Sequence, residues 1–419
     1  MGPDSVALLC GARLATRSAD TQFPFRQDSD FHYLTGFDHP HAVAVLRTDG
    51  GPAFTLYVEP RQRDAETWTG HRPGVEGAVR DYGADEAHPI EELSGHVPGL
   101  IERARRLLFI LGRDAALDAR LTETLEQMRL RSRTGVVPAS EIADPRAILH
   151  EMRLFKEPAE IEIMRRAAAI TLEAHRATAP GARAGRFEYE LEAMLEYHFR
   201  KRGASGPAYG TIVGGGANAT VLHYVSNRAR LRDGDLVLID AGCELEGYAS
   251  DVTRSYPVGG RFEGPGAAIY DIVLEAQEAS IAAAKPGATL EDVHTAAVRR
   301  LTEGMVSLGL LAGEVDGLVE SGAYKAYYMH RTSHWLGLDV HDVGAYTCEG
   351  RPRALEPGMV FTVEPGLYVR MDEEKADPRL HGIGVRIEDN LLVTADGHEN
   401  LTAAIAKRPR DVEAWVVGS

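Results

Sequence analysis

The chain has 419 residues and a net charge of −16, and 44% of its residues are hydrophobic while 26% are charged. This composition is ordinary for a folded globular protein, and the length predicts two domains because a single core rarely grows so large. The acidic balance argues against nucleic acid or a membrane surface as a partner, and no apolar run is long enough to span a bilayer.

The N-terminal part of the chain alternates strand-like and helix-like patterns. Apolar and β-branched residues predict strands at 42–46 and 53–58, and a turn sequence at 48–52 separates them. A basic helix at 100–106 and a strand at 107–112 are expected further along. These elements predict a small α/β domain over residues 1–148.

A change in pattern near Asp144-Pro145 marks the expected domain boundary. Beyond it, apolar residues recur at helical spacing, and long helices are expected at 158–179, 188–202, 266–284 and 290–309. Strand and turn signals alternate with these helices. We therefore expect an α+β domain over residues 149–419.

Two segments of this second domain look like hairpins that each carry a pair of acids. The first begins with an apolar strand that ends in Asp240, and the chain returns with Asp251. The second begins with an apolar strand that ends in Glu364 and returns through a strand that ends in Glu388. Because opposite residues of antiparallel strands point to the same face, each hairpin is expected to present two acids to one point. These strands are expected at 236–240, 359–364 and 384–388.

Together with His334, these acids form a set suited to two divalent cations. Oxygen-rich sites with few histidines favour Mn²⁺, Co²⁺ or Zn²⁺, and two such ions can share a water and acidify it into a nucleophile. A lone aspartate at a strand end, such as Asp240, is more often a turn or cap residue. Glu364 indicates a site more strongly, because a glutamate deep in an apolar strand is rarely buried without a partner or a metal. No phosphate-binding loop, GxSxG or HExxH motif is present.

Six stretches of the chain resemble the aminopeptidase P family of the pita-bread metallopeptidase superfamily, which includes prolidase, methionine aminopeptidase and creatinase. The matching stretches are residues 23–37, 212–224, 236–256, 330–344, 356–368 and 384–390. The resemblance implies a pseudo-symmetric α+β pita-bread catalytic domain, preceded by a smaller N-terminal α/β domain of creatinase type. It also implies hydrolysis of the bond between an N-terminal residue and a penultimate proline, by water or hydroxide that bridges two divalent metals.

The family pattern implies that five residues bind the two metal ions, which are usually Mn²⁺, with Zn²⁺ or Co²⁺ as alternatives. In that pattern Asp251 and Glu388 bridge the ions, Asp240 completes one site, and His334 and Glu364 complete the other. Glu364 is also implied as the proton shuttle. All five residues are intact in this sequence.

The resemblance gives roles to five further side chains of the second domain. His223 and His341 match histidines that steady the tetrahedral intermediate, which is the task of oxyanion donors. His341 also fits a further metal ligand or a loop residue, and His330 matches a substrate-binding position. Arg386 and Tyr368 match positions behind the ligands, where an arginine orients a carboxylate and keeps it ionised.

Two residues of the N-terminal domain are also implied in function. Asp38 matches a position that reaches the active site of a neighbouring subunit, and Trp68 matches a residue near the substrate cleft. Asp38 also fits a simple turn residue, and Trp68 also fits a core or interface residue. Because the family commonly forms dimers and tetramers, a homo-oligomer is expected.

Two alternative functions use the same fold. Prolidase cuts only dipeptides and shares the metal ligands, so the ligands do not separate it from aminopeptidase P. The context of Trp335 and the N-terminal stretch favour aminopeptidase P. A metal-free pita-bread binding module would require lost ligands. We therefore expect peptides with a penultimate proline as partners, and neither nucleic acid nor a membrane.

The cysteines and the first residues predict the compartment. Cys10, Cys243 and Cys348 are spaced neither as a disulfide framework nor as a metal-binding pair, which favours a reducing cytoplasm. The first residues carry no signal-peptide pattern. A cytoplasmic location is therefore expected.

Overall fold

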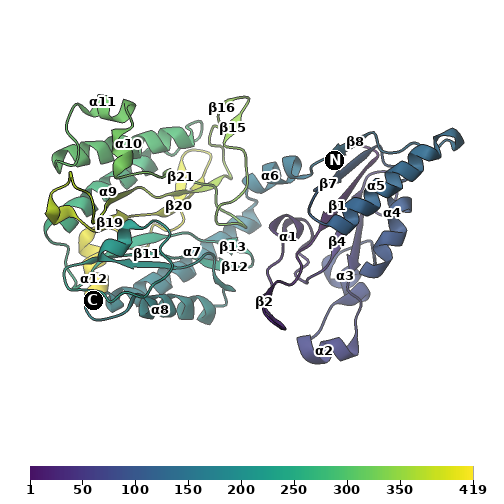
Figure 1. Cartoon of the computed structure of the whole chain (residues 1–419), viewed down its shortest axis with the longest axis horizontal. Helices are drawn as coiled ribbons and strands as arrows, with labels where there is room; N and C mark the ends of the chain where they lie inside the picture. The colour runs from purple at the N-terminus through teal and green to yellow at the C-terminus, as the bar shows by residue number, and fades with distance from the viewer. Residues whose placement is uncertain (419) are drawn as a thin grey trace. The chain divides into compact units, whose positions relative to one another are not determined.

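The computed structural model describes residues 1–418, apart from the side chain of Ala65, and divides into two compact units (Figure 1). The first unit spans Met1–Glu151 and the second begins at Met152. The expected domain boundary between residues 148 and 149 falls inside helix α6 (Arg146–Leu154), and the domain limits stay a prediction. None of the described helices is long and apolar enough to cross a membrane.

The first unit is built on one mixed six-stranded sheet, with the strand order β6-β5-β4-β1-β7-β8. Its strands are β1 (Ser5–Cys10), β4 (Val43–Arg47), β5 (Phe54–Val58), β6 (Glu86–Pro89), β7 (Arg106–Phe109) and β8 (Glu141–Ala143). A separate small pair consists of β2 (Thr16–Ser18) and β3 (Thr21–Gln22). The helices before α6 are α1 (Ser29–Thr35), α2 (Arg63–Thr69), α3 (Gly74–Tyr82), α4 (Leu93–Ile101) and α5 (Ala115–Leu130).

Helices bury both faces of this sheet, as the central strand β1 shows. Val6 and Leu8 belong to a core shared with α4 and α5, whereas Ala7 and Leu9 belong to a core shared with α1 and α3. Successive side chains of a strand point to opposite faces, so a strand covered on both sides is apolar throughout. This arrangement explains the uninterrupted apolar run at the start of the chain.

The strand predictions at 42–46 and 53–58 are confirmed to within one residue by β4 and β5. The predicted helix at 100–106 is wrong, because α4 ends at Ile101 and strand β7 begins at Arg106. Arg106 pairs in parallel with Ser5 of β1, so tertiary pairing overrides the local helical preference of the basic segment. Strand β7 also ends at Phe109, three residues before the predicted end at 112.

The second unit combines six helices after α6 with short sheets. The helices are α7 (Pro158–Thr178), α8 (Glu188–Lys201), α9 (Gly264–Ala283), α10 (Leu290–Ser307), α11 (Val315–Glu320) and α12 (Pro409–Val417). The first strands are β9 (Gly206–Pro207), β10 (Ile212–Gly215), β11 (Leu236–Asp240), β12 (Cys243–Leu245), β13 (Tyr248–Ala249) and β14 (Thr253–Pro257). The later strands are β15 (Thr347–Cys348), β16 (Arg351–Pro352), β17 (Val360–Val363), β18 (Gly366–Val369), β19 (Ile383–Arg386), β20 (Asp389–Val393) and β21 (His398–Asn400).

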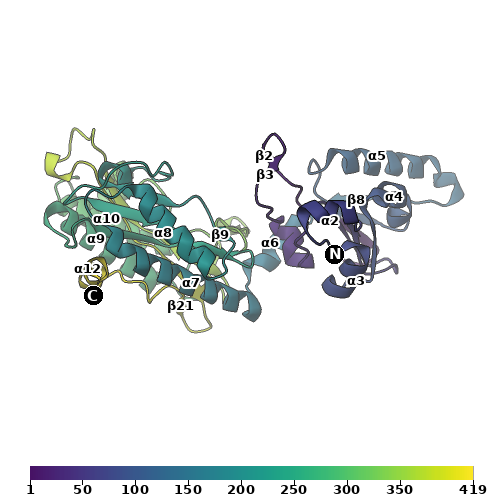
Figure 2. The same ribbon diagram turned by 90° about the horizontal axis from the view of Figure 1, so that it is seen from below.

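The second unit repeats one plan, in which two long helices are followed by strands that carry acids. The pair α7 and α8 precedes β9–β14, and the pair α9 and α10 precedes β15–β21. Apolar side chains of α7, α8 and α12 pack with β10, β11, β12 and β14, and those of α9 and α10 pack with β18 and β19. In the view of Figure 1 the strands of this unit lie between the pair α9 and α10 and the pair α7 and α8, and Figure 2 shows the unit from the side of α7 and α8. The four predicted long helices are confirmed to within two residues at each end.

The strand pairing of the second unit contains the two predicted hairpins, with short breaks near the acids. Asp240, the last residue of β11, lies opposite Thr253 of β14, so Asp251 precedes the ladder. In the later half, β17 pairs with β20, and β18 pairs with β19. Both ladders follow one antiparallel register, in which Val363 lies opposite Asp389 and Gly366 lies opposite Arg386. The predicted second hairpin is therefore present, with a break in both strands at Glu364 and Glu388, which this register places opposite each other.

Gly242 shows how closely the chain approaches itself beside one acid. A Cβ atom at this position would lie 1.8 Å from the carbonyl oxygen of Ser250 and 3.0 Å from the amide nitrogen of Asp251. Only glycine permits such a close approach of two backbone segments. The glycine therefore allows Asp251 to lie beside the end of β11.

Candidate active site

Four carboxylates of the second unit surround one cavity of about 700 Å³. Asp240 ends β11, and Asp251 precedes β14 by two residues. Glu364 directly follows β17, and Glu388 directly precedes β20. The structure thus brings together the four acids that the sequence singles out, although they come from two different strand pairs.

His334 lies in the same cavity, and hydrogen bonds fix its orientation. Its main-chain carbonyl accepts a hydrogen bond from Thr362 of β17 at 3.0 Å. The Nδ1 atom donates to the carbonyl oxygen of Trp335 at 2.9 Å, so the Nε2 atom faces the acids. Nε2 lies 3.3 Å from Asp251 Oδ2 and 3.7 Å from Glu364 Oε1. Asp251, His334 and Glu388 each offer a ligand atom, and these atoms lie within 4.8 Å of one another.

The charges in the cavity are unbalanced in favour of the acids. Its wall contains four carboxylates but only two arginines, Arg331 and Arg386. Burial and mutual repulsion raise the pKa of Asp240 and raise that of Glu388 well above its usual value. Burial likewise raises the pKa of Glu364 to about 8. Crowded buried acids of this kind are stable when cations neutralise them, so the donor set fits divalent metal ions.

The pKa of His334 is shifted by its acidic neighbours. Burial alone would lower this pKa, but the hydrogen bond and the charge of Asp251, together with the charge of Glu364, raise it to about 9. The imidazole thus experiences the negative electrostatic field of Asp251 and Glu364, and the same field would attract a cation. The field is therefore a property of the whole cavity and not of one acid.

Arg386 anchors the acids from behind. Its guanidinium donates to Asp240 Oδ2 at 2.6 Å, to Thr253 Oγ1 at 3.1 Å and to the Tyr368 hydroxyl at 3.0 Å. Burial opposes the charged form, yet the surrounding acids and Tyr368 raise the pKa of Arg386 further above its usual range. The guanidinium therefore stays charged, and it holds Asp240 in one orientation.

Three further histidines that the sequence singles out line the same cavity. Burial and the nearby Arg386 charge lower the pKa of His330 to about 3, so its ring is neutral. Its Nδ1 donates to the carbonyl of Arg331 at 2.8 Å, and its Nε2 lies 2.9 Å from the Tyr368 hydroxyl. His341 packs against His334 with ring centroids 4.4 Å apart. His223 reaches the wall from the segment after β10 and is exposed to solvent.

A buried ion pair locks together the strands behind the acids. Arg254 of β14 donates to Asp389 of β20 at 2.6 Å, and both side chains are fully buried. Arg254 also donates to the main-chain carbonyl of Glu388. Burial alone would raise the pKa of Asp389, but the charges of Arg254 and Lys407 outweigh it and depress that pKa. The pair therefore fixes the spacing between the segments that carry Asp251 and Glu388.

Asp38 and Trp68 belong to the first unit and do not line this cavity. The exposed Asp38 accepts a hydrogen bond from the Tyr82 hydroxyl at 2.8 Å. Trp68 lies in α2 and is 89% exposed, so the alternative that it is a core residue is wrong. The functional roles of both residues stay predictions.

Sequence reasoning missed three side chains that position the acids. Tyr209 donates to Asp240 Oδ1 at 2.6 Å, and Thr253 donates to Glu388 Oε2 at 2.7 Å. The side-chain oxygen of Asn390 accepts from the Asp251 amide at 3.0 Å. Asn390 stands two residues after a predicted ligand, as does Thr253, so the two-residue repeat of a strand offers a signal for both. No pattern in the sequence distinguishes Tyr209.

Comparisons with known proteins match both units. Residues 162–395 match the model of metallopeptidase family M24, and residues 1–109 match that of the aminopeptidase P N-terminal domain. The chain is 45% identical to an Escherichia coli Xaa-Pro aminopeptidase over 100% of this chain and 95% of the relative. It superposes on a Pseudomonas aeruginosa aminopeptidase with a TM-score of 0.96 and 46% identity, covering 100% of this chain and 95% of that structure. It also superposes on zinc-substituted E. coli aminopeptidase P in complex with product, with a TM-score of 0.95, 45% identity and the same coverages.

The chain belongs to metallopeptidase family M24 and carries the N-terminal domain of aminopeptidase P. Within the family, the relatives from Escherichia coli and Haemophilus influenzae, which match the chain over 99–100% of its length, are Xaa-Pro aminopeptidases. The predicted fold, a pita-bread catalytic domain with a smaller N-terminal α/β domain, is confirmed by these matches, as is the resemblance to aminopeptidase P. The alternative of a metal-free binding module lacks support, since all five predicted metal ligands line one cavity.

Proposed function

We propose that this chain removes the N-terminal residue from peptides with proline in second position, as an aminopeptidase that requires two divalent metal ions. One observation carries the proposal, namely that three buried acids, the half-buried Glu364 and His334 share one cavity with His223, His330 and His341. The Xaa-Pro aminopeptidase relatives, which match the chain along its full length, support the same activity.

Asp240, Asp251, His334, Glu364 and Glu388 are the residues that would hold the two ions. When bound, such ions acidify a water and polarise the scissile carbonyl. Four ionised carboxylates balance the charge of two divalent cations, and a set dominated by oxygen favours Mn²⁺ over softer metals. Mn²⁺ is therefore the proposed native ion, with Zn²⁺ or Co²⁺ as substitutes. The zinc-substituted relative shows that a similar protein accepts Zn²⁺.

Residues of the cavity wall would supply the remaining chemistry. His223 and His341 would donate hydrogen bonds to the negative oxygen that develops on the attacked carbonyl. Glu364 would take the proton of the attacking water and pass it to the leaving proline nitrogen. This nitrogen needs the proton because an amide nitrogen leaves poorly as an anion. Glu364 suits the task because its two oxygens face the wall histidines, with His334 and His330 each 3.7 Å away.

The same cavity offers an apolar surface for the proline ring. Ile212, Leu222, Val225 and Val340 contribute to its wall. Burial of a ring on such a surface contributes about 25 cal/mol per Å² of apolar area. The preference for proline would thus arise from contacts beside the acids. The neutral His330, which is held by Tyr368, would contact the part of the substrate that lies beside the acids.

Assembly and location complete the proposal. The 89% exposure of Trp68 supports a contact with a second copy or with substrate, in keeping with a homo-oligomer in which Asp38 faces a neighbouring active site. The three cysteines are free, and Cys348 is exposed, which supports a reducing cytoplasm. Light scattering of the purified chain tests assembly, because a strictly monomeric mass would contradict it.

A peptide panel tests the proposed specificity. The Mn²⁺-loaded chain is assayed with Gly-Pro, with a tripeptide that begins Gly-Pro, and with a matched tripeptide that begins Gly-Ala. We expect fast release of glycine from the Gly-Pro tripeptide alone. Strict preference for the Gly-Pro dipeptide would identify a prolidase instead. Equal rates with the two tripeptides would overturn the proposed role of proline.

A further inference from the structure

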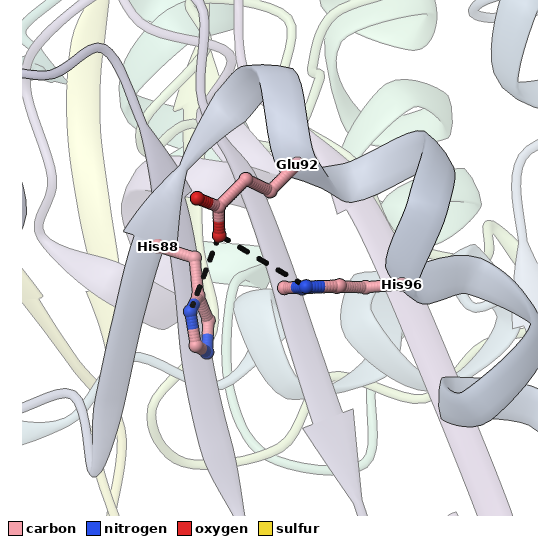
Figure 3. Close-up of side chains that lie close together, drawn as sticks. All are labelled: His88, Glu92 and His96. Carbon is pink, nitrogen blue, oxygen red and sulfur yellow. Dashed lines mark ion pairs between the residues drawn. The ribbon is translucent and has the colours of Figure 1, made fainter.

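A second cluster of metal-binding side chains lies in the first unit, outside the candidate active site. His88 of β6, Glu92 of the short 3₁₀ turn Ile90–Glu92 and His96 of α4 point toward one another (Figure 3). Glu92 Oε2 lies 3.9 Å from His88 Nδ1 and 3.9 Å from His96 Nε2. All three ligand atoms lie within 4.8 Å of one another. The family matches give these residues no role.

The outer nitrogen of each imidazole already has a partner. His96 Nδ1 lies 3.1 Å from the Tyr57 hydroxyl, and His88 Nε2 lies 3.5 Å from Glu86 Oε2. In the tautomer in which His96 Nδ1 donates to Tyr57 and the N–H of His88 faces the Glu86 carboxylate, the inner nitrogens present free lone pairs to Glu92. Metal-binding histidines use the same arrangement, because the outer hydrogen bond fixes the tautomer and turns the ring toward the ion. The cluster therefore has both the ligand atoms and the groups that orient them.

The distances allow a tetrahedral ion after a small adjustment. Bonds of about 2.0–2.1 Å at the tetrahedral angle place neighbouring ligand atoms roughly 3.4 Å apart. The histidines must therefore each move about half an ångström toward Glu92. The side chains are between 32% and 50% exposed, so they are free to make this movement. Two histidines and one carboxylate leave a fourth position for water, as in open zinc sites.

We propose that His88, Glu92 and His96 bind one Zn²⁺ ion, which ties the edge strand β6 to helix α4. Strand β6 ends the six-stranded sheet and pairs with only one neighbour, β5. An ion held between β6 and α4 fastens this edge to the layer that covers it. The nitrogen-rich set favours Zn²⁺ over Mn²⁺, because Mn²⁺ stands at the weak end of the first-row affinity series and imidazole suits zinc. The two centres of the molecule thus differ in the metal that they prefer.

Zinc binding to the intact chain tests this site. The full chain is dialysed against Zn²⁺ with Mn²⁺ in excess, and bound zinc is measured by elemental analysis. The same measurement is made on the double variant His88→Gln/His96→Gln. We expect the double variant to bind one zinc ion per chain fewer, while its hydrolysis of the Gly-Pro tripeptide stays unchanged. A circular dichroism spectrum equal to that of the natural chain reports an intact fold, and this readout does not depend on the active-site proposal.

Two single variants sharpen the result. Glu92→Gln removes the charge but keeps the shape, and it should weaken zinc binding at this site at least about tenfold. His71→Gln is the matched control, because His71 also faces a carboxylate, Glu66 at 3.6 Å, but stands outside the cluster. It should bind as much zinc as the natural chain. Equal zinc content in the natural chain and the double variant would overturn the site and reduce the cluster to a polar and aromatic contact.

Discussion

The acid cluster of the second unit and the histidine cluster of the first unit make opposite use of their surroundings. The acids are buried or half-buried, and Arg386, Thr253 and Tyr209 hold them in place. His88, Glu92 and His96 are partly exposed and are held mainly through Tyr57 and Glu86. Burial raises the free-energy cost of ionising the acids. A bound cation that neutralises them therefore stabilises the buried cluster more than it would stabilise an exposed one.

The contrast extends to what each centre can do. A buried set with fixed geometry is suited to chemistry, because preorganised groups need no rearrangement during the reaction. An exposed set that tolerates movement is suited to a structural ion. Function and burial therefore separate the two clusters more clearly than residue type does, since each contains both histidine and carboxylate.

Loss of one acid should have the largest effect. In Asp251→Asn the shape and the backbone hydrogen bonds to Asn390 are kept, but one ligand charge is lost. Activity on the Gly-Pro tripeptide should fall at least about a thousandfold, because loss of a single oxyanion donor alone is worth about 10²–10³. Steady-state assay at saturating Mn²⁺ measures the effect.

The control for this variant is Asp271→Asn, which changes an exposed acid of α9 outside the cavity. It should retain full activity. An Asp251→Asn variant with unchanged kcat/KM would contradict the claim that the acid cluster of the second unit, unlike the histidine cluster of the first, is needed for activity.

The buried ion pair behind the acids should have the next largest effect. Asp389→Asn leaves Arg254 buried without its charged partner, and such losses cost about 3–5 kcal/mol of unfolding free energy. Denaturant titration measures this change. Asp372→Asn, in an exposed pair with Arg370, should change stability by less than about 0.5 kcal/mol. Similar losses of unfolding free energy in the two variants would show that the buried ion pair behind the acids stabilises the fold no more than an exposed pair does.

The pH dependence of stability should show a smaller effect, which comes from a buried histidine behind the acids. His175 is fully buried between the Tyr256 hydroxyl and the carbonyl of Ala241, beside Asp240, and burial lowers its pKa to about 4. The folded chain thus binds a proton less readily than the unfolded chain, whose histidine keeps a pKa of 6.5. Stability from this group is complete above pH 6.5 and is lost as the pH falls toward 4, by roughly 3 kcal/mol.

Comparison with His175→Gln isolates this contribution. Unfolding free energies of the natural chain and of the variant are measured from pH 8 to pH 4 under the same metal conditions. The natural chain should lose more stability than the variant as the pH falls below 6.5. Parallel curves would show that His175 does not act as a buried neutral base.

The sequence predicts the acids and the hairpins that carry them, but not the breaks in those hairpins or the side chains behind the acids. Asp240, Glu364 and Glu388 stand out because an acid next to an apolar strand is unusual, and that signal is local. The break that divides the second hairpin into the pairs β17–β20 and β18–β19 depends on contacts between distant segments, which no local pattern records. The roles of Tyr209 and of the Arg254–Asp389 pair are not predictable from the sequence for the same reason. Both roles depend on contacts that form only in the folded chain.

The helix predictions show where local signals suffice. The amphipathic pattern fixes α7–α10 to within two residues. The error at 100–106 arises because Arg106 joins β1 through parallel pairing, which outweighs the helical preference of a basic segment. His88, Glu92 and His96 are evenly spaced in the sequence, but they lie in a strand, a turn and a helix, so the spacing alone does not predict their convergence.

The central claim is that five residues of the second unit hold two cations on which peptidase activity depends. Titration of Mn²⁺ into the metal-free chain, with bound metal and hydrolysis of the Gly-Pro tripeptide measured on the same samples, tests it most directly. The account predicts no hydrolysis without metal and an activity that reaches its plateau as two ions bind per chain. Full hydrolysis by the metal-free chain, or a plateau with no bound Mn²⁺, would contradict it.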